Sequence, residues 1–474
     1  MAADRRDYRL AGPENALSFE RGLAEAAWWR PPIDDARLTE LMQRSNARAA
    51  RDTVLWLGLI VGLAVVVVAT WFSWYSVPLL VAYGALYGGA ADSRWHEMGH
   101  GTAFRWQPAN TAIYHLASFM LWRGPTTWRW SHYRHHTDTI IVGRDAEIVF
   151  PRPSSVRGLP LLYTHAVGGT QMLRRIVKNA FGHVDDEARD FVPESELRRV
   201  VWEGRVFVAI LAATVAASVL WWTPLPVLLV GLPTYYGAWL VVFFGITQHA
   251  GLQEDVLDHR LNTRTVYMNP VFRWLYSNMN YHIEHHLFPG VPYRNLPALH
   301  DEIKDSLPPA LPNTLAAYRE LVGALREIES DTSWELTTRD VPDVPSANAD
   351  PIDVGPMVPE QLKAGEDADL GPVSAVPVGR AKRVDIAGRT FALYRLGEDD
   401  VALSDGLCTH GAAHLAEGLV IDCQIECPKH NGRFDLRTGE PVRKPVKQPL
   451  TMYPCEVRDG RVVADLSEIE ETST

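Results

Sequence analysis

The fold is decided first by a long uncharged stretch, which reads TVLWLGLIVGLAVVVVATWFSWYSVPLLVAYGALYGGAA from Thr53 to Ala91. A second stretch, Val206–Gln253, is also uncharged apart from His249. A membrane span needs about 20 apolar residues, so each stretch is long enough for two spans. Aromatic residues and prolines near each midpoint indicate a turn at a membrane–water interface: Trp71, Phe72, Trp74, Tyr75 and Pro78, and then Trp221, Trp222, Pro224 and Pro226. The sequence therefore predicts an all-α membrane domain with about four transmembrane spans; a pair of buried core helices is the alternative.

Basic residues predict the orientation of these spans. Arg37, Arg44, Arg48 and Arg51 precede the first stretch, and the two predicted turns contain no Lys or Arg. Because basic residues stay on the cytoplasmic side, we expect the N-terminal segment and the parts that follow the spans to lie in the cytoplasm, on a protein integral to the inner membrane. The first 50 residues are polar and rich in Arg, so no cleavable signal peptide is expected.

Three histidine clusters follow the predicted spans and read HEMGH at 96–100, HYRHH at 132–136 and HIEHH at 282–286. Histidines three or four residues apart share one face of a helix, and neutral imidazole binds iron, copper, zinc and nickel. With one histidine at the expected cytoplasmic end of the fourth span, the candidate ligands are too many for one metal ion and suit two. They are His96, His100, His132, His135, His136, His249, His282, His285 and His286.

The first cluster has a second interpretation. HEMGH matches the pattern of zinc proteases, in which Glu97 would be the general base. A catalytic zinc site takes three protein ligands, and the two further clusters would then have no role. The grouping of eight histidines into three short motifs also argues against ordinary surface histidines. The sequence therefore favours a centre of two metal ions.

With their flanking residues, the clusters resemble those of the integral-membrane fatty acid desaturase and hydroxylase superfamily over roughly residues 50–310. The flanks are Trp128-Arg129-Trp130-Ser131, Asn278-Met279-Asn280-Tyr281 and Leu287-Phe288-Pro289. Within the superfamily, the chain is similar to the branch that contains the rhizopine-catabolism oxygenase. The resemblance implies two non-haem iron ions held by the nine histidines, O2 as co-substrate, and no catalytic residues beyond the iron ligands. It also places Glu97 and Glu284 outside the ligand set.

The composition changes after the predicted helical part. Residues 331–371 contain ten acidic and two basic residues and five prolines, which accounts for most of the net charge of −11 and is typical of a solvated linker. Alternating apolar residues at 384, 386, 391 and 393, and a turn at Asp459-Gly460, then predict a small all-β domain. We expect four parts: an N-terminal segment 1–50, a membrane domain 51–325, a linker 326–371 and a β domain 372–474.

A second metal motif lies in this β domain. It reads CTH at 408–410 and CPKH at 427–430. A Cys₂His₂ zinc site would pair Cys-x-x-Cys with His-x-x-x-His, and that pairing is absent. The spacing resembles that of the Rieske ferredoxins of oxygenase systems, which implies a [2Fe–2S] cluster with two thiolate and two imidazole ligands. Those ligands would be Cys408, His410, Cys427 and His430. In a reducing cytoplasm, the remaining Cys423 and Cys455 are expected to be free thiols.

Together, the two motifs predict an O2-dependent membrane oxidoreductase with its own electron donor. The sequence has no Gly-x-Gly-x-x-Gly fingerprint, so NAD(P)H and flavin are expected in a separate reductase. Hydroxylation, or a demethylation that begins as hydroxylation, is favoured over desaturation of an acyl chain by the same iron centre. A non-enzymatic electron carrier or redox sensor would leave the clustered histidines without a role. The expected partners are the reductase, membrane lipids and a lipid or small organic substrate; no basic stripe indicates nucleic acid.

Overall fold

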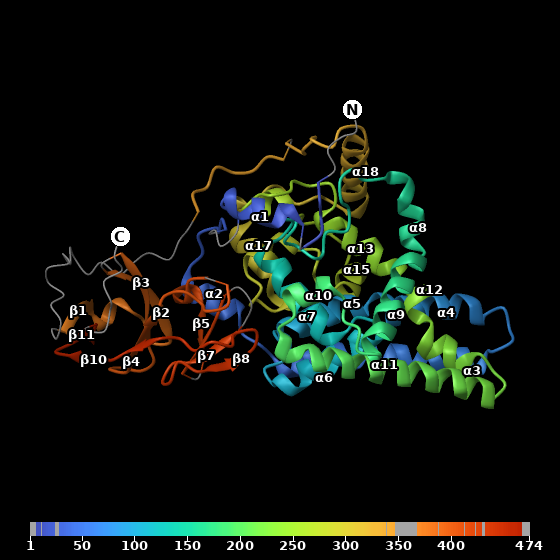
Figure 1. Ribbon diagram of the computed structural model, residues 1–474, viewed down its shortest axis with the longest axis horizontal. Coiled ribbons are helices and arrows are strands. Elements are labelled where there is room, and N and C mark those ends of the chain that lie inside the picture. Colours follow the sequence, from blue (N-terminus) through green and yellow to red (C-terminus); the bar gives the residue numbers. More distant parts are fainter. Residues whose placement is uncertain are drawn as a thin grey trace. The chain divides into compact units, whose positions relative to one another are not determined.

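Figure 1 shows the computed structural model of the chain, which describes residues 6–10, 12–23, 28–337, 339–346, 367–386, 388–411, 413–421, 423–428 and 432–466. The chain forms two compact units. The first comprises Met1–Leu287 and Val291–Val344, and the second comprises Pro345–Thr474 with Phe288–Gly290. The first is helical and the second consists of strands, which confirms the predicted order of an α part followed by a β part.

The first unit is built from helices that carry both the apolar stretches and the histidine clusters (Figure 1). In chain order they are α1 (Pro13–Glu20), α2 (Asp35–Leu41), α3 (Asn46–Ala69), α4 (Ser76–Gly84), α5 (Ala91–His100), α6 (Gln107–Met120), α7 (Pro125–Thr137), α8 (Leu159–Tyr163), α9 (Ala166–Ala180), α10 (Asp186–Phe191), α11 (Glu194–Leu220), α12 (Pro233–Gly237), α13 (Trp239–His249), α14 (His259–Asn262), α15 (Pro270–Leu275), α16 (His282–Leu287), α17 (Leu296–Ile303) and α18 (Thr314–Ser330).

Two of these helices, α3 and α11, are long and apolar enough to cross a membrane. The Ser45 side chain caps α3 by accepting a hydrogen bond from the Arg48 backbone N–H. Only 22% of the most apolar window of α3 and 17% of that of α11 are buried, whereas a core helix of a soluble protein is mostly buried. The aromatic turn after each helix is exposed, with Phe72 and Trp222 more than 90% accessible. Both helices therefore present apolar side chains outward.

The returning segments are interrupted rather than continuous. A π-helical turn, η1 (Ala85–Gly89), separates α4 from α5, and η3 (Val227–Gly231) precedes α12 and α13. Among the described residues, the structure thus has two long apolar helices where the sequence predicted about four spans. The interruptions lie where α4 and η1 pack on α12: a Cβ added to Gly237 would lie 1.9 Å from the carbonyl oxygen of Gly84. Glycine permits this approach, and π turns are local insertions that shift the helical register.

A core of aromatic side chains holds α5 in place. Trp56 is fully buried and donates from Nε1 to the carbonyl oxygen of Leu86 at 2.9 Å. Tyr114 on α6 stacks against Trp95 on α5, with ring centroids 5.9 Å apart, and donates to the carbonyl oxygen of Pro125 at the start of α7. Helices α5 and α7, which carry the first two histidine clusters, are therefore positioned by the same packed side chains.

The second unit is all-β. Its strands form sheets in the orders β1-β11-β10, β2-β3-β4-β9 and β5-β6-β7-β8, and every neighbouring pair is antiparallel. The strands are β1 (Asp367–Pro372), β2 (Arg380–Ile386), β3 (Arg389–Arg395), β4 (Val401–Asp405), β5 (Leu419–Ile421), β6 (Gln424–Glu426), β7 (Arg433–Asp435), β8 (Pro441–Arg443), β9 (Met452–Tyr453), β10 (Cys455–Arg458) and β11 (Arg461–Asp465). The predicted hairpin at Asp459-Gly460 is confirmed, because β10 pairs with β11 up to Arg458 and Arg461 and both turn residues have positive φ.

The boundaries of the parts can be compared with these elements. Helix α18 runs to Ser330 and β1 begins at Asp367, whereas the sequence predicted a linker over 326–371. Residues 347–366 of that linker lie outside the described residues.

Candidate metal centre

The nine predicted histidines converge from four helices of the first unit. They form two groups, and within each group one nitrogen atom from every ring lies within 4.8 Å of those of the others. The first group contains His96, His100, His132, His136 and His285. The second contains His135, His249, His282 and His286. Helices α7 and α16 contribute to both groups, so two adjacent metal sites share their supporting helices.

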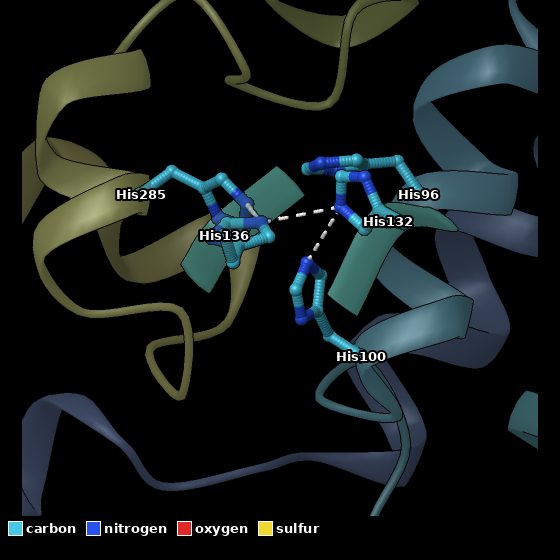
Figure 2. A group of neighbouring side chains, drawn as sticks. All are labelled: His96, His100, His132, His136 and His285. Carbon is cyan, nitrogen blue, oxygen red and sulfur yellow. Dashed lines mark hydrogen bonds between the residues drawn. The ribbon is translucent and has the colours of Figure 1, made fainter. Parts of the chain in front are cut away.

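The Nε2 atoms are spaced as ligands of a common ion would be. The Nε2 atom of His132 lies 3.1 Å from that of His100 and 3.2 Å from that of His136 (Figure 2). In the second group, the Nε2 atom of His282 lies 3.1 Å from that of His249 and 3.2 Å from that of His286. Two nitrogens about 2.1 Å from one ion and about 95° apart around it are separated by about 3.1 Å. Both groups therefore fit a metal ion.

Several of the rings are oriented through their outer nitrogen. His135 donates from Nδ1 to the Asp145 carboxylate at 2.9 Å, and His249 donates from Nδ1 to the carbonyl oxygen of Asn262 at 2.9 Å. His132 Nδ1 is 3.3 Å from the Glu147 carboxylate. A proton on Nδ1 leaves the Nε2 lone pair free, and this is the form of histidine that binds a metal. These acceptors thus hold the rings with Nε2 facing the metal sites.

Burial sets the protonation of most of the cluster. It lowers the pKa of His132 and His285 well below the ordinary value of 6.5, and neighbouring histidines lower it further. His135 is the exception. Burial also acts against its charged form, but the charge of Asp145 and the hydrogen bond to it raise the pKa of His135 to about 9. Neutral imidazoles with one buried carboxylate nearby are suited to a cation.

The two glutamates in the histidine motifs take no part in the groups. Among the described residues, neither group contains a carboxylate. Glu97 is buried and accepts a hydrogen bond from the Thr102 hydroxyl at 2.6 Å. Glu284 is buried, accepts a hydrogen bond from the Thr265 hydroxyl at 2.6 Å and contacts His300. Their positions argue against the protease interpretation, in which Glu97 would face the metal ion.

Some residues around the centre were not singled out by the sequence. Asp145 and Glu147 lie in a loop after α7, and no periodic pattern links them to the histidines they support. His259 packs its ring 4.9 Å from that of His286 and stacks on Trp28 at 4.2 Å. Asn262, on the same short helix, orients His249 through its carbonyl oxygen.

The second unit places the two motif cysteines in one apolar core. Cys408 follows β4 and Cys427 follows β6, and both are buried beside Tyr394. The backbone N–H of Cys408 donates to Ala413 and that of Cys427 to Gly432, so each cysteine starts a tight loop. His410 lies in the first loop, and the predicted ligand His430 lies outside the described residues. The leftover Cys423 and Cys455 are half-buried and form no disulfide.

The two units define an oxidoreductase with a helical, histidine-lined metal domain and a small β domain with an iron–sulfur motif. The chain belongs to the fatty acid desaturase family, which matches residues 69–318, and its second unit is a Rieske [2Fe-2S] domain over residues 367–454. Family membership implies non-haem iron in the first domain and a [2Fe–2S] cluster in the second.

Proteins of three dioxygenase systems are similar to the Rieske domain of this chain. The ferredoxin component of a naphthalene 1,2-dioxygenase system from Pseudomonas aeruginosa is 41% identical over 92 residues, which are 19% of this chain and 88% of the relative. The ferredoxin subunit of an anthranilate 1,2-dioxygenase from Burkholderia cepacia is 44% identical over 78 residues, 16% of this chain and 71% of the relative. A chain in the solved complex of reduced oxygenase and oxidized ferredoxin in carbazole 1,9a-dioxygenase is 35% identical, with a TM-score of 0.20, and covers 20% of this chain and all of the solved one.

Proposed function

We propose that the protein is a membrane-bound, O2-dependent di-iron oxygenase that receives electrons from its own Rieske domain. The observation that carries this proposal is the convergence of nine buried or half-buried histidines into two adjacent groups of five and four. Neither group reaches the six ligands of an octahedral ion, so positions are left for other ligands. The bound irons would supply the activation of O2 for attack on a C–H bond.

The protein's own residues hold and orient this centre. The ligand set is the nine histidines, with Asp145 and the Asn262 carbonyl fixing the tautomers of His135 and His249. In the Rieske domain, we assign the cluster to Cys408, His410, Cys427 and His430. The buried position of both cysteines supports this assignment.

The proposed location is the inner membrane, with the iron sites on the cytoplasmic side. The helices α3 and α11 and the broken segments α4–η1 and η3–α13 would form about four spans. The outward-facing apolar surfaces of α3 and α11 and the exposed aromatic turns support it. The linker over 326–371 would tether the donor to the oxygenase, and a separate flavin-dependent NAD(P)H reductase would reduce the Rieske cluster.

The proposed reaction is hydroxylation, or a demethylation that begins with it, of a lipid or small organic molecule. It consumes one O2, two electrons and two protons and releases one water. The Rieske relatives from two dioxygenase systems support oxygenation. Desaturation of an acyl chain is the second candidate, because the family that matches the helical unit is the fatty acid desaturase family.

Isotope labelling distinguishes these reactions. Membranes from cells that produce the protein are supplied with NADH, ¹⁸O2 and a panel of fatty acids, acyl phospholipids, alkanes and methylated amines. The matched control contains the His285→Ala variant. Hydroxylation incorporates ¹⁸O into an organic product in the wild-type sample alone, and demethylation places it in the released one-carbon fragment. Desaturation gives a product lighter by two hydrogens with the label in water. Equal oxygen uptake by both membrane samples would contradict the proposal.

A further inference from the structure

A cavity of about 280 Å³ lies on the side of α5 that faces away from the metal centre. Arg94, Glu97 and Met98 line it, whereas His96 and His100 on the same helix join the other histidines. At about 100° per residue, Arg94 and His96 point in directions about 160° apart around the helix axis. The cavity therefore belongs to neither histidine group, although one helix separates it from them.

The cavity is lined by more cations than anions. Its arginines are Arg51, Arg94, Arg273 and Arg294, and its carboxylates are Asp52 and Glu97. Both carboxylates have partners: Asp52 pairs with Arg51 at 2.9 Å and accepts from the Tyr293 hydroxyl at 2.6 Å, and Glu97 accepts from the Thr102 hydroxyl. Among the described residues, three of the four guanidinium groups make no ion pair.

Arg94 is the most deeply placed of these cations. It is only 6% exposed, and its hydrogen bonds go to the Ser93 hydroxyl and to backbone carbonyls, including that of Trp274 at 2.8 Å. The Trp274 ring packs against it, 4.9 Å from the guanidinium carbon. No carboxylate pairs directly with Arg94, and Asp52, whose charge favours its cation, is already paired with Arg51. Because a buried cation is costly, an anion in the cavity would stabilise it further.

The other two guanidinium groups that lack an ion pair hydrogen-bond to neutral partners, although the charge of Glu97 also acts on Arg294. Arg273 donates to the Asn278 side-chain oxygen at 2.9 Å, and Arg294 donates to the carbonyl oxygens of Ala103 and Gln43 at 3.2 and 2.9 Å. Both side chains are half-buried and line the same cavity as Arg94. Arginine forks match the oxygens of phosphate, and a volume near 300 Å³ is at the lower end of ligand sites.

The cavity also adjoins apolar surface at the start of a candidate membrane span. Thr53 lines it, and the next residue along α3, Val54, is 70% exposed. On the other side, Pro270 lines it and Val271 is 64% exposed. A cationic cavity beside outward-facing apolar side chains matches an amphiphile with an anionic head and an apolar tail.

We propose that this cavity binds the phosphate headgroup of an anionic phospholipid, with the acyl chains along the exposed face of α3. The bound headgroup would neutralise Arg94 and brace α5, the helix that carries His96 and His100. The proposal depends on the membrane placement of α3 and is independent of the reaction, so oxygen-uptake results leave it unaffected.

Lipid titration tests the proposal. The iron-loaded full-length protein in neutral detergent is titrated with phosphatidylglycerol, and bound lipid is counted by native mass spectrometry. The double variant Arg273→Gln/Arg294→Gln removes two charge-assisted donors to the phosphate, so it should lose at least about tenfold in affinity. The matched control, Arg319→Gln/Arg326→Gln, changes two exposed arginines of α18 that do not line the cavity; it should stay within about twofold.

Other titrants separate the sources of the anion. Phosphatidylcholine, whose headgroup has no net charge, should not occupy the site. Inorganic phosphate alone should bind much more weakly than phosphatidylglycerol, and equal binding would assign the site to a free anion and overturn the lipid assignment. Unchanged phosphatidylglycerol affinity in the double variant would overturn the site itself. If the double variant loses its helical circular dichroism, the two single variants, each expected to lose severalfold, decide between these outcomes.

Discussion

At the scale of single residues, the hydrogen bond made by the Nδ1 atom of a histidine matters as much for metal binding as the Nε2 atom that faces the site. The carboxylate of Asp145 is completely buried. It accepts hydrogen bonds from His135 Nδ1 and from the backbone N–H of Ile140. One side chain thereby orients a ligand and ties down the loop that follows α7. The Asn262 carbonyl does the same for His249. The histidine motifs alone do not make the centre; the loops that contain these acceptors complete it.

Asp145→Asn should weaken metal binding without removing a ligand. The amide keeps the shape of the carboxylate but loses the charge that favours cation binding, and such changes cost about 10–100-fold in metal affinity. The measurement is iron retained during titration with a chelator. Asp190→Asn, which removes the partner of Arg134 on the same helix α7, is the control and should retain iron as the wild type does. Equal retention by both variants would show that Asp145 has no role in the centre.

His115 on α6 predicts a pH dependence of stability. Burial, with the charge of Arg199, lowers its pKa from 6.5 to about 4, and its Nε2 accepts a hydrogen bond from Arg199 at 3.2 Å. The unfolded chain therefore takes up a proton between pH 6.5 and 4 that the folded protein refuses, so stability is full above pH 6.5 and falls as the pH drops. The loss is less than about 1.4 kcal/mol per pH unit, because the side chain is only half-buried.

The variant His115→Gln isolates this contribution. Glutamine can still accept a hydrogen bond from Arg199, and it does not titrate. Thermal unfolding of both proteins at pH 7.5 and pH 5.5 gives the comparison. The wild type should lose more stability between the two pH values than the variant does, and a loss of the same size in both would remove His115 as a cause.

At the scale of elements, the crossing of α4 and α12 is the feature that hydropathy could not predict. The uncharged stretch predicted its helices correctly as helices, but apolar composition carries no information on where two backbones touch. Gly84 and Gly237 are the residues at which these two backbones meet. The π turns η1 and η3 lie beside this contact and depend on it. The helix register that turns His96 and His100 toward the centre follows directly after η1.

Gly237→Ala should disrupt this crossing. The new methyl group would lie 1.9 Å from the carbonyl oxygen of Gly84, which is backbone and cannot rotate away. Overpacking of this kind costs about 1–3 kcal/mol or more. Gly245→Ala on α13 is the matched control, since its methyl group meets nothing within 4 Å, and alanine favours a helix by about 1 kcal/mol over glycine. Melting temperatures in detergent should fall for the first variant and stay or rise for the second.

Some features of the metal centre and of the fold are predictable from the sequence, and others are not. Histidines at spacings of three and four lie on one helix face by geometry alone, which accounts for eight of the nine candidates. His249 stands alone and follows only from its position at the end of a predicted span. The structure brings all nine together. Asp145 reaches His135 through an irregular turn after α7, and no periodicity predicts such a contact. The β hairpin at Asp459-Gly460 was predictable because two turn residues with positive φ leave a local signature.

At the scale of the whole molecule, the chain combines two domains that match two different family models. The Rieske relatives are whole ferredoxins of about the size of the second unit, so this unit corresponds to a complete carrier. Fusion to the oxygenase domain would replace a bimolecular encounter by an intramolecular one. An effective concentration in the millimolar range is expected for two domains joined by a linker.

Severing the chain between the two units tests the tether. A protease site inserted within residues 347–366, followed by cleavage, leaves both units intact. With each half at about 1 µM, a thousandfold below a millimolar effective concentration, substrate-dependent oxygen uptake should drop steeply. Adding the free Rieske half at increasing concentration should restore it. Uptake that is unchanged by cleavage would mean that the tether contributes nothing to electron delivery.

Two ligand variants assign the two iron centres separately. His285→Ala removes a proposed ligand from the group of five histidines. It should abolish product formation with every electron donor and should lower the amount of bound iron. Cys427→Ala removes a buried cysteine from the Rieske core and should abolish the absorbance of the cluster while leaving the helical domain loaded. Because the second change affects electron delivery alone, a small artificial reductant such as reduced methyl viologen should restore product formation in Cys427→Ala and not in His285→Ala. Product formation by His285→Ala with that reductant would place the chemistry outside the histidine centre. If the reductant does not restore product formation in Cys427→Ala, the Rieske domain does more than carry electrons.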